Sequence, residues 1–194
     1  MIRRREALRR SDGVVAIEFA LILPVLLMLV FGIIEFGMLF RSELSVSQSA
    51  RAGARTAAAL PRTAGYQTSA ANAVAAQLRN TLSTDEITYL SIYKADKATG
   101  LPADGGTYKT CTSCYRFSWN AATKSWVSES GASWPATSQK ACGAEATTDY
   151  LGVYVEARYN WVTAIFKPMF GNSMTVSERT IMRLEPIGNG STCS

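Results

Sequence analysis

The chain has 194 residues and a formal net charge of +5. Five arginines in residues 1–13 stand against Glu6 and Asp12, so this short flank carries +3 and the rest of the chain only +2. A nucleic-acid partner is therefore not expected. The sequence contains no histidine, which excludes Ser-His and Cys-His nucleophile pairs and mixed Cys/His zinc sites. We expect no catalytic activity, no cofactor or metal, and no small-molecule substrate.

Residues 1–13 form a charged leader, and a long apolar stretch, residues 14–40, follows it. No charged residue occurs from Phe19 to Ile34. Because about 20 helical residues cross a hydrocarbon core about 30 Å thick, residues 14–40 are predicted to be a transmembrane helix. A buried core helix is the alternative, but the chain has no second apolar segment of similar length to cover it. The arginine cluster marks the cytoplasmic side, which predicts a single-pass protein of the cell (inner) membrane with residues 41–194 outside.

Two carboxylates and one proline interrupt the apolar stretch. Glu35 stands where the helix would leave the membrane, so we expect water to solvate it. Glu18 lies nearer the other end, and a charge within a bilayer costs about 3 kcal/mol on insertion scales. Pro24 removes one helical hydrogen bond, so we expect a kink or a loosened turn there.

Residues 41–60 predict an extracytoplasmic continuation of the helix, ended by Pro61. Small and apolar residues recur at steps of three, four or seven from the end of the apolar stretch through this continuation. These seam residues are Gly32, Phe36, Leu39, Val46, Ala50, Gly53, Ala57 and Leu60. A seam of small side chains allows another backbone to approach closely. It fits either a neighbouring helix or the globular part of the same chain.

Residues 61–194 predict an extracytoplasmic α+β domain. A second helix is expected over Gln67–Leu82, with Val74, Leu78 and Leu82 on its packing face. An antiparallel sheet of about four or five strands should follow. The expected strands are Glu86–Tyr93, with Ile87, Tyr89 and Tyr93 on one face, then Tyr115–Trp119 and Ser125–Ser128 as a hairpin, then Tyr150–Tyr159 and Met174–Leu184. Residues 160–173 are expected to be an irregular apolar connection.

All four cysteines, Cys111, Cys114, Cys142 and Cys193, lie in the part assigned outside, where disulfides persist. Four cysteines allow three full connectivities, and the spacing does not choose between them. Cys111-x-x-Cys114 is also the spacing of a redox or zinc half-site. Structural disulfides are the favoured interpretation, with Cys114 paired to Cys142.

The N-terminal residues resemble the TadE-like family, the pseudopilins of the tight-adherence (Flp) pilus system. The resemblance rests on Arg9-Arg10-Ser11-Asp12-Gly13-Val14-Val15-Ala16-Ile17-Glu18-Phe19-Ala20, then Leu23-Pro24 and the apolar run. It covers residues 9–60, and residues 179–186 look like the closing strand of such proteins. A basic leader, a glycine, four apolar residues, a glutamate and an aromatic residue form the type IV pilin-like pattern.

The resemblance implies cleavage after Gly13 by a prepilin peptidase, which makes Val14 the new N-terminus and Glu18 the fifth mature residue. A carboxylate in lipid needs a partner, and the freed amine of Val14 on a neighbouring subunit would supply one. The expected partners are the lipid bilayer, the prepilin peptidase, other pilin or pseudopilin subunits and the pilus assembly machinery. Because residues 61–194 exceed the size of a main Flp pilin, a minor subunit is expected.

Two alternatives keep the same topology. One is a signal-anchored extracytoplasmic binding or adhesion domain that needs no cleavage at Gly13. The other is a disulfide-active or hydrolytic enzyme on the outer face, which would depend on Cys111 and Cys114.

Overall fold

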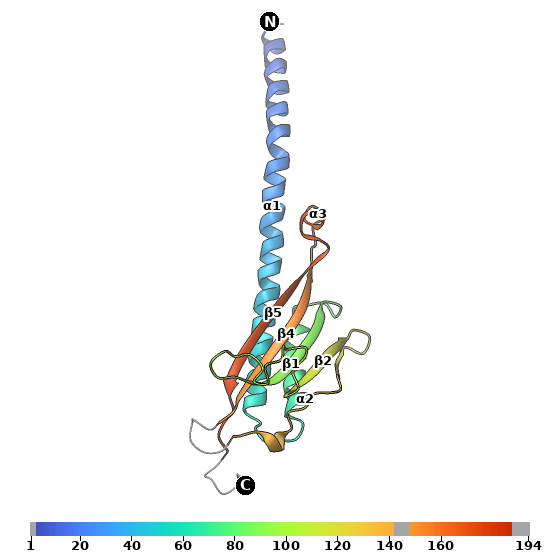
Figure 1. Cartoon of the computed structure of the whole chain (residues 1–194). Coiled ribbons are helices and arrows are strands. Elements are labelled where there is room, and N and C mark those ends of the chain that lie inside the picture. Colours follow the sequence, from blue (N-terminus) through green and yellow to red (C-terminus); the bar gives the residue numbers. More distant parts are fainter. Residues whose placement is uncertain (1–2, 142–147, 188–194) are drawn as a thin grey trace.

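The protein folds into one long helix, a second helix and a five-stranded antiparallel sheet (Figure 1). This computed structural model describes residues 3–141 and 148–187, with side chains from Gly13 onward. The predicted α+β class, with its long N-terminal helix, is confirmed.

The long helix α1 covers Arg3–Ala58 as one continuous element that passes through Pro24. Figure 1 shows no sharp bend along it, so the predicted kink at Pro24 is not present. The proline still removes one backbone hydrogen bond from the helix. After Ala58 the chain turns through Pro61, and Arg62 adopts a left-handed φ of 55°, which ends the helix as predicted.

The second helix, α2, covers Tyr66–Leu78, and the sheet order is β3-β2-β1-β4-β5. The strands are β1 (Ile87–Ala95), β2 (Cys114–Asn120), β3 (Ser125–Ser128), β4 (Tyr150–Asn160) and β5 (Ser173–Arg183). A 3₁₀ turn, η1, lies at Ala136–Ser138, and a one-turn helix, α3, lies at Lys167–Phe170 in the β4–β5 connection. The predicted hairpin is present as β2–β3, where Trp119 pairs with Trp126.

One face of the sheet packs against α1 and α2 and forms the main core. Alternate β4 residues point into it, as their pattern predicts, and all four are at most 1% exposed: Leu151, Val153, Val155 and Ala157. Val74, Leu78 and Leu82 meet them from the α2 side and are also buried.

The two faces of β1 are divided differently from the prediction. Ile87 lies in the main core with Leu90 and Ile92, whereas Tyr93 lies in a separate buried cluster with Cys111. The register with β4 shifts between Ile87 and Tyr89, which marks a bulge or irregularity. An extra residue at a bulge reverses which face the following side chains occupy, so the expected common face for Ile87, Tyr89 and Tyr93 is wrong.

The outer face of the sheet is crossed by the β1–β2 connection, residues 96–113. Tyr93 lies over Gly152, its partner on β4, and donates a hydrogen bond to the Gly100 carbonyl at 2.9 Å. A Cβ on Gly152 would collide with the Tyr93 ring. The lack of a side chain at Gly152 therefore leaves the space that the Tyr93 ring occupies under the loop.

Candidate functional site: the N-terminal helix

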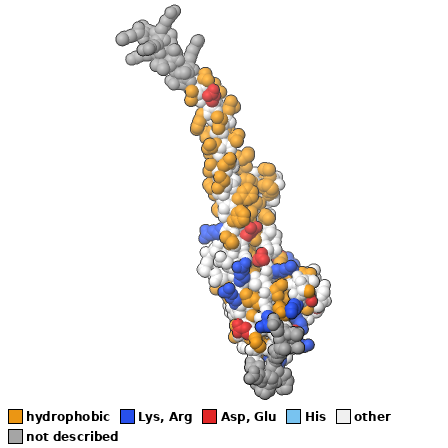
Figure 2. All heavy atoms as spheres, turned by 90° about the vertical axis from the view of Figure 1, so that its left-hand side faces the viewer, with side chains coloured by type: hydrophobic (Ala, Val, Ile, Leu, Met, Phe, Trp, Pro, Cys, Tyr) orange, Lys and Arg blue, Asp and Glu red, His pale blue; other side chains and the backbone are white. Residues whose placement is uncertain are grey.

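The first half of α1 stands clear of the rest of the protein. Nearly all large apolar side chains from Val14 to Ile34 are exposed, and none of the most apolar 18 residues of the helix is buried. Among the described residues, this is the one helix that is long and apolar enough to span a membrane. Figure 2 shows the apolar side chains surrounding this half of the helix, whereas Lys, Arg, Asp and Glu gather further along, over the domain.

The residues predicted to be processed and paired all lie on this exposed half. A Cβ on Gly13 would meet no atom within 4 Å, and Val14 is 57% exposed. Glu18 is exposed one helical turn further along, among apolar neighbours. The helix thus places Val14 and Glu18 at neighbouring positions on one face.

The second half of α1 is buried in its own domain. Five seam residues, Leu39, Val46, Ala50, Gly53 and Ala57, are buried, and the serines between them face the same side. The ideal Cβ of Gly53 would lie 2.5 Å from Cγ2 of Val74 on α2 and 3.4 Å from Cγ1 of Val153 on β4. Of the two alternatives for the seam, packing on the same chain is therefore the one observed from Leu39 to Ala57.

Glu35 marks the point where the exposed half of α1 meets the domain. Its Oε1 accepts hydrogen bonds from the Tyr159 hydroxyl and the Val162 amide, both at 2.8 Å. Its Oε2 accepts hydrogen bonds from Thr163, from the amide at 2.8 Å and the hydroxyl at 2.6 Å. The side chain is 0% exposed. One carboxylate thereby ties the β4–β5 connection to the helix.

The expectation that water solvates Glu35 is wrong. Its partners are more than 120 residues away in sequence: Tyr159 lies near the end of β4, and Val162 and Thr163 lie in the segment expected to be an irregular connection. A buried carboxylate needs several donors to offset the loss of hydration, and two consecutive backbone amides together with two hydroxyls supply them here. The sequence shows an isolated acid at the end of an apolar stretch, which marks Glu35 as unusual but does not identify its hydrogen-bond donors.

Comparison with known proteins gives a match over the same segment. Residues 13–55 match the family model described as TadE-like protein. This segment is therefore similar to the TadE-like family. No curated protein and no solved structure matches the chain. The match agrees with the resemblance found from the sequence.

The cysteine-bearing loop lies beyond the matched TadE-like segment. Cys111 and Cys114 form a disulfide with a Cα–Cα distance of 5.9 Å, and the two residues are 1% and 0% exposed. The expected pairing of Cys114 with Cys142 is therefore wrong. A turn in which the Cys111 amide donates to the Thr107 carbonyl at 2.9 Å brings Cys111 back beside Cys114. Cys142 and Cys193 lie outside the described residues.

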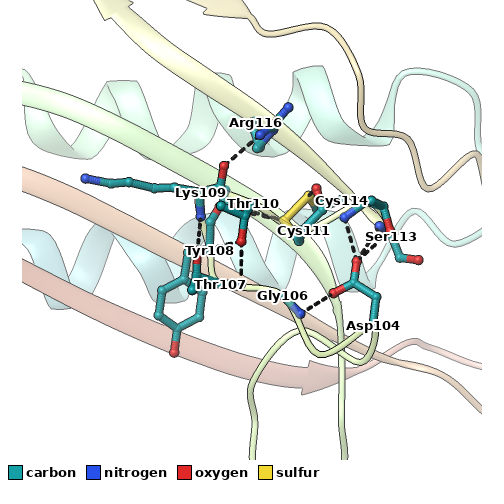
Figure 3. The surroundings of a disulfide bond; sticks show 12 residues. Asp104, Gly106, Thr107, Tyr108, Lys109, Thr110, Cys111, Ser113, Cys114 and Arg116 are labelled. Atoms are coloured by element: carbon teal, nitrogen blue, oxygen red, sulfur yellow. Dashed lines mark hydrogen bonds between the residues drawn. A yellow bond between two sulfur atoms is a disulfide. The ribbon is translucent and has the colours of Figure 1, made fainter.

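Asp104 organises the loop around this disulfide (Figure 3). Its Oδ1 accepts a hydrogen bond from the Gly106 amide, and its Oδ2 accepts from the Thr112 amide and hydroxyl and from the Ser113 amide. Burial acts to raise the pKa of this carboxyl, but the hydrogen bonds outweigh it and lower the pKa from 3.8 to about 2. The loop is thus fixed by a covalent bond and by a charged hydrogen-bond acceptor.

Proposed function

We propose that this protein is a minor pseudopilin that takes part in the assembly of a tight-adherence, type IV-like pilus. In this proposal a prepilin peptidase removes the leader after Gly13, and Val14 becomes the N-terminus of the mature chain. The N-terminus lies in the cytoplasm before cleavage, and the domain lies outside the inner membrane. Its partners are the bilayer, the peptidase, other pilin-like subunits and the assembly machinery.

The observation that carries the proposal is the exposed first half of α1. The family match begins at Gly13, the residue of the proposed cleavage, and the side chains that follow are exposed and apolar. A protein that used this helix only as its own core would bury it. The second half packs on the domain, so the first half remains available to lipid and then to neighbouring subunits.

Glu18 has the chemistry of a pairing residue in this proposal. It is the one carboxylate between Val14 and Ile34, and the surface around it is apolar. An isolated carboxylate in lipid is unfavourable unless a cation lies close to it. The freed amine of Val14 on an adjacent subunit would meet that need and would set the stagger between neighbouring helices.

Processing is tested by sequencing the N-terminus of the protein made with and without the prepilin peptidase. We expect the mature chain to begin at Val14 only when the peptidase is present. Gly13→Leu should block processing without disturbing the fold, because a side chain at this position would meet open space. An intact leader under both conditions would contradict the proposal and favour the signal-anchored binding or adhesion domain.

Pairing is tested by Glu18→Gln. We expect normal processing and normal protein levels but a loss of pili, because the neutral amide cannot attract the freed amine. Glu43→Gln is a matched control, since Glu43 is an exposed acid on the same helix outside the apolar stretch. Piliation that survives Glu18→Gln would contradict the role of this carboxylate.

The proposal includes no catalytic activity of this chain. The Cys111–Cys114 disulfide is buried, whereas disulfides used in exchange must be reached by a partner thiolate. Replacing both cysteines by serine should therefore lower stability and leave pilus assembly intact wherever protein levels are matched. Loss of function at matched protein levels would favour the disulfide-active alternative.

A further inference from the structure

The β4–β5 connection, residues 161–172, lies beside the exposed half of α1 (Figure 1). Cζ of Phe166 is 3.8 Å from the position of an added Cβ on Gly32, and its ring centroid is 6.3 Å from that of Phe36. Trp161 and Phe170 stack around Phe166 with centroid distances of 6.0 and 6.3 Å. The connection therefore reaches the level of Gly32, which lies within the predicted transmembrane stretch.

This connection and the start of β5 expose large apolar side chains. They are Val162 (64% exposed), Ile165 (41%), Met169 (72%), Phe170 (53%) and Met174 (44%). Lys167 is the only charged residue from 161 to 174. Such a group of exposed apolar side chains marks an interaction surface. It continues the apolar surface of α1, and Figure 2 shows both as one apolar region above the charged part of the domain.

Many backbone amides of the connection have hydrogen-bond partners within the protein, which favours contact with the interfacial layer of a bilayer. The Val162 and Thr163 amides donate to Glu35, and the Phe166, Met169, Phe170 and Gly171 amides donate to carbonyls within the connection. Pro168 has no amide hydrogen to satisfy. Backbone donors left unpaired in hydrocarbon cost several kcal/mol each, so a segment with internal partners is suited to a membrane surface.

We propose that residues 162–170 form a second membrane-contacting element, which enters the outer interfacial layer of the bilayer beside α1. The proposal rests on the proposed placement of α1 across the membrane. Residues 14–34 supply about 30 Å of helix, so Gly32 lies only a few ångströms inside the outer edge of the hydrocarbon. The apolar side chains then contact lipid, and Lys167 extends its amine toward the headgroups.

Lipid is the occupant that the surroundings favour. The apolar surface is continuous with that of the helix, and toward the domain there are two exposed cations, Arg41 on α1 and Arg158 on β4, together with the exposed acid Glu43 on α1. Cations at this level suit lipid phosphates. The hydrogen bonds to Glu35 hold the connection at a fixed depth, so the domain would be anchored at two points and held in one orientation.

Native methionines allow a test in the full chain. The protein is labelled with ¹³C at the methionine methyl groups and placed in phosphatidylcholine nanodiscs that contain nitroxide lipids, with the label either near the headgroup or deep in the acyl chain. Met28 reports on the spanning helix and Met169 on the connection, and both are exposed. A Leu101→Met variant adds an exposed reporter at the opposite end of the sheet, about 30 Å away along β4.

We expect the Met28 signal to be lost with the deep nitroxide and the Met169 signal with the shallow one, while the signal added by Leu101→Met keeps its intensity with both. A water-soluble gadolinium chelate should quench the signal added by Leu101→Met more strongly than the Met169 signal. If Met28 is quenched and Met169 behaves like the Leu101→Met reporter, the second contact is wrong although the span stands. If Met28 is not quenched, α1 does not span the bilayer and both proposals fail.

Discussion

Glu18 and Glu35 belong to the same helix but have opposite surroundings. Glu18 is exposed among apolar side chains, while Glu35 is buried and accepts four hydrogen bonds at 2.6 to 2.8 Å. Two acids in one apolar segment therefore differ in their surroundings, and the proposed pairing concerns only Glu18. The charge of Glu35 is satisfied within the chain, whereas Glu18 is exposed and would be accessible to the partner subunit that we propose.

Glu35→Gln should release the β4–β5 connection. The NH₂ group of glutamine is a hydrogen-bond donor, so it would be placed against at least one donor that now bonds to the carboxylate. The hydrogen bonds that remain would no longer have a charged acceptor. We expect local stability to fall by about 1–3 kcal/mol. Amide hydrogen exchange at Val162 and Thr163, measured in detergent or nanodiscs, should accelerate accordingly.

Glu18→Gln is the matched control for this measurement. It makes the same chemical change on the same helix, but at an exposed position, so exchange at Val162 and Thr163 should not change. Equal effects of the two substitutions, or no acceleration with Glu35→Gln, would contradict the role assigned to the Glu35 carboxylate.

Asp104 predicts a specific dependence of stability on pH. Its pKa is about 2 in the folded protein and 3.8 as the ordinary value, so its contribution is fully present above about pH 4 and is lost as pH falls toward 2. The residue is exposed, so solvent screening limits the effect to about 1 kcal/mol or less. The stability difference between wild type and Asp104→Asn, from denaturant unfolding, should shrink over this range. A constant difference would contradict it.

At the residue scale, unusual residues could be recognised from the sequence, but their long-range partners could not. The pair Cys111-x-x-Cys114 was recognisable, yet its bonding depends on the turn that begins at Thr107, and spacing alone does not reveal that turn. Likewise, Glu35 was recognisable as an anomaly in an apolar stretch. Its four donors come from Tyr159, Val162 and Thr163, and no local pattern links them to α1.

The long helix divides into two elements by what surrounds it. Large apolar side chains dominate the exposed half, while the buried half carries small ones, including Ala50, Gly53, Ala54 and Ala57, that let α2 and β4 come close. The periodicity of the seam was visible in the sequence. Its partner was not, because a small-residue seam suits a neighbouring subunit as well as the helix and sheet of the same chain.

Gly53→Ala tests this close approach. The added methyl would lie 2.5 Å from Cγ2 of Val74, so α1 and α2 must separate or Val74 must move. We expect the free energy of unfolding to fall by about 1–3 kcal/mol, partly offset by the gain of about 1 kcal/mol in helix propensity. Denaturant unfolding followed by circular dichroism in detergent measures the change.

Gly37→Ala provides the comparison on the same helix. Its added methyl would meet no atom within 4 Å, so only the gain in helix propensity applies and stability should be unchanged or slightly higher. If both alanine variants behave alike, the seam does not control how α1 packs.

Among the strands, regular alternation was the reliable signal. In β4, Leu151, Val153 and Val155 alternate with outward-facing residues, and the strand begins at the predicted residue. In β1 the irregularity near Thr88 reverses the face of part of the strand, and a bulge has no mark in the hydrophobic pattern. The connection after β4 is apolar without periodicity, because its side chains face α1 on one side and the outside on the other.

At the scale of the whole molecule, the core includes side chains from both 41–60 and 61–194. Val46, Ala50 and Ala54 are 0% exposed and belong to one cluster with Leu78 of α2 and Val153 of β4. The helix that carries the membrane-spanning stretch is thus also a structural part of the domain. The exposed half and the half packed on the sheet belong to one continuous helix.

A pair of truncated chains tests this continuity. Residues 41–194 keep the buried half of the helix from Ser42 onward and should fold, whereas residues 61–194 expose the face formed by α2 and β4. Each large apolar side chain left in water costs about 1.5–3 kcal/mol, which a domain of this size cannot lose several times over. We therefore expect a cooperative unfolding transition and dispersed amide signals for 41–194, and aggregation or a lack of cooperativity for 61–194. A stably folded 61–194 chain would show that the second half of α1 is an accessory to the domain and not part of its core.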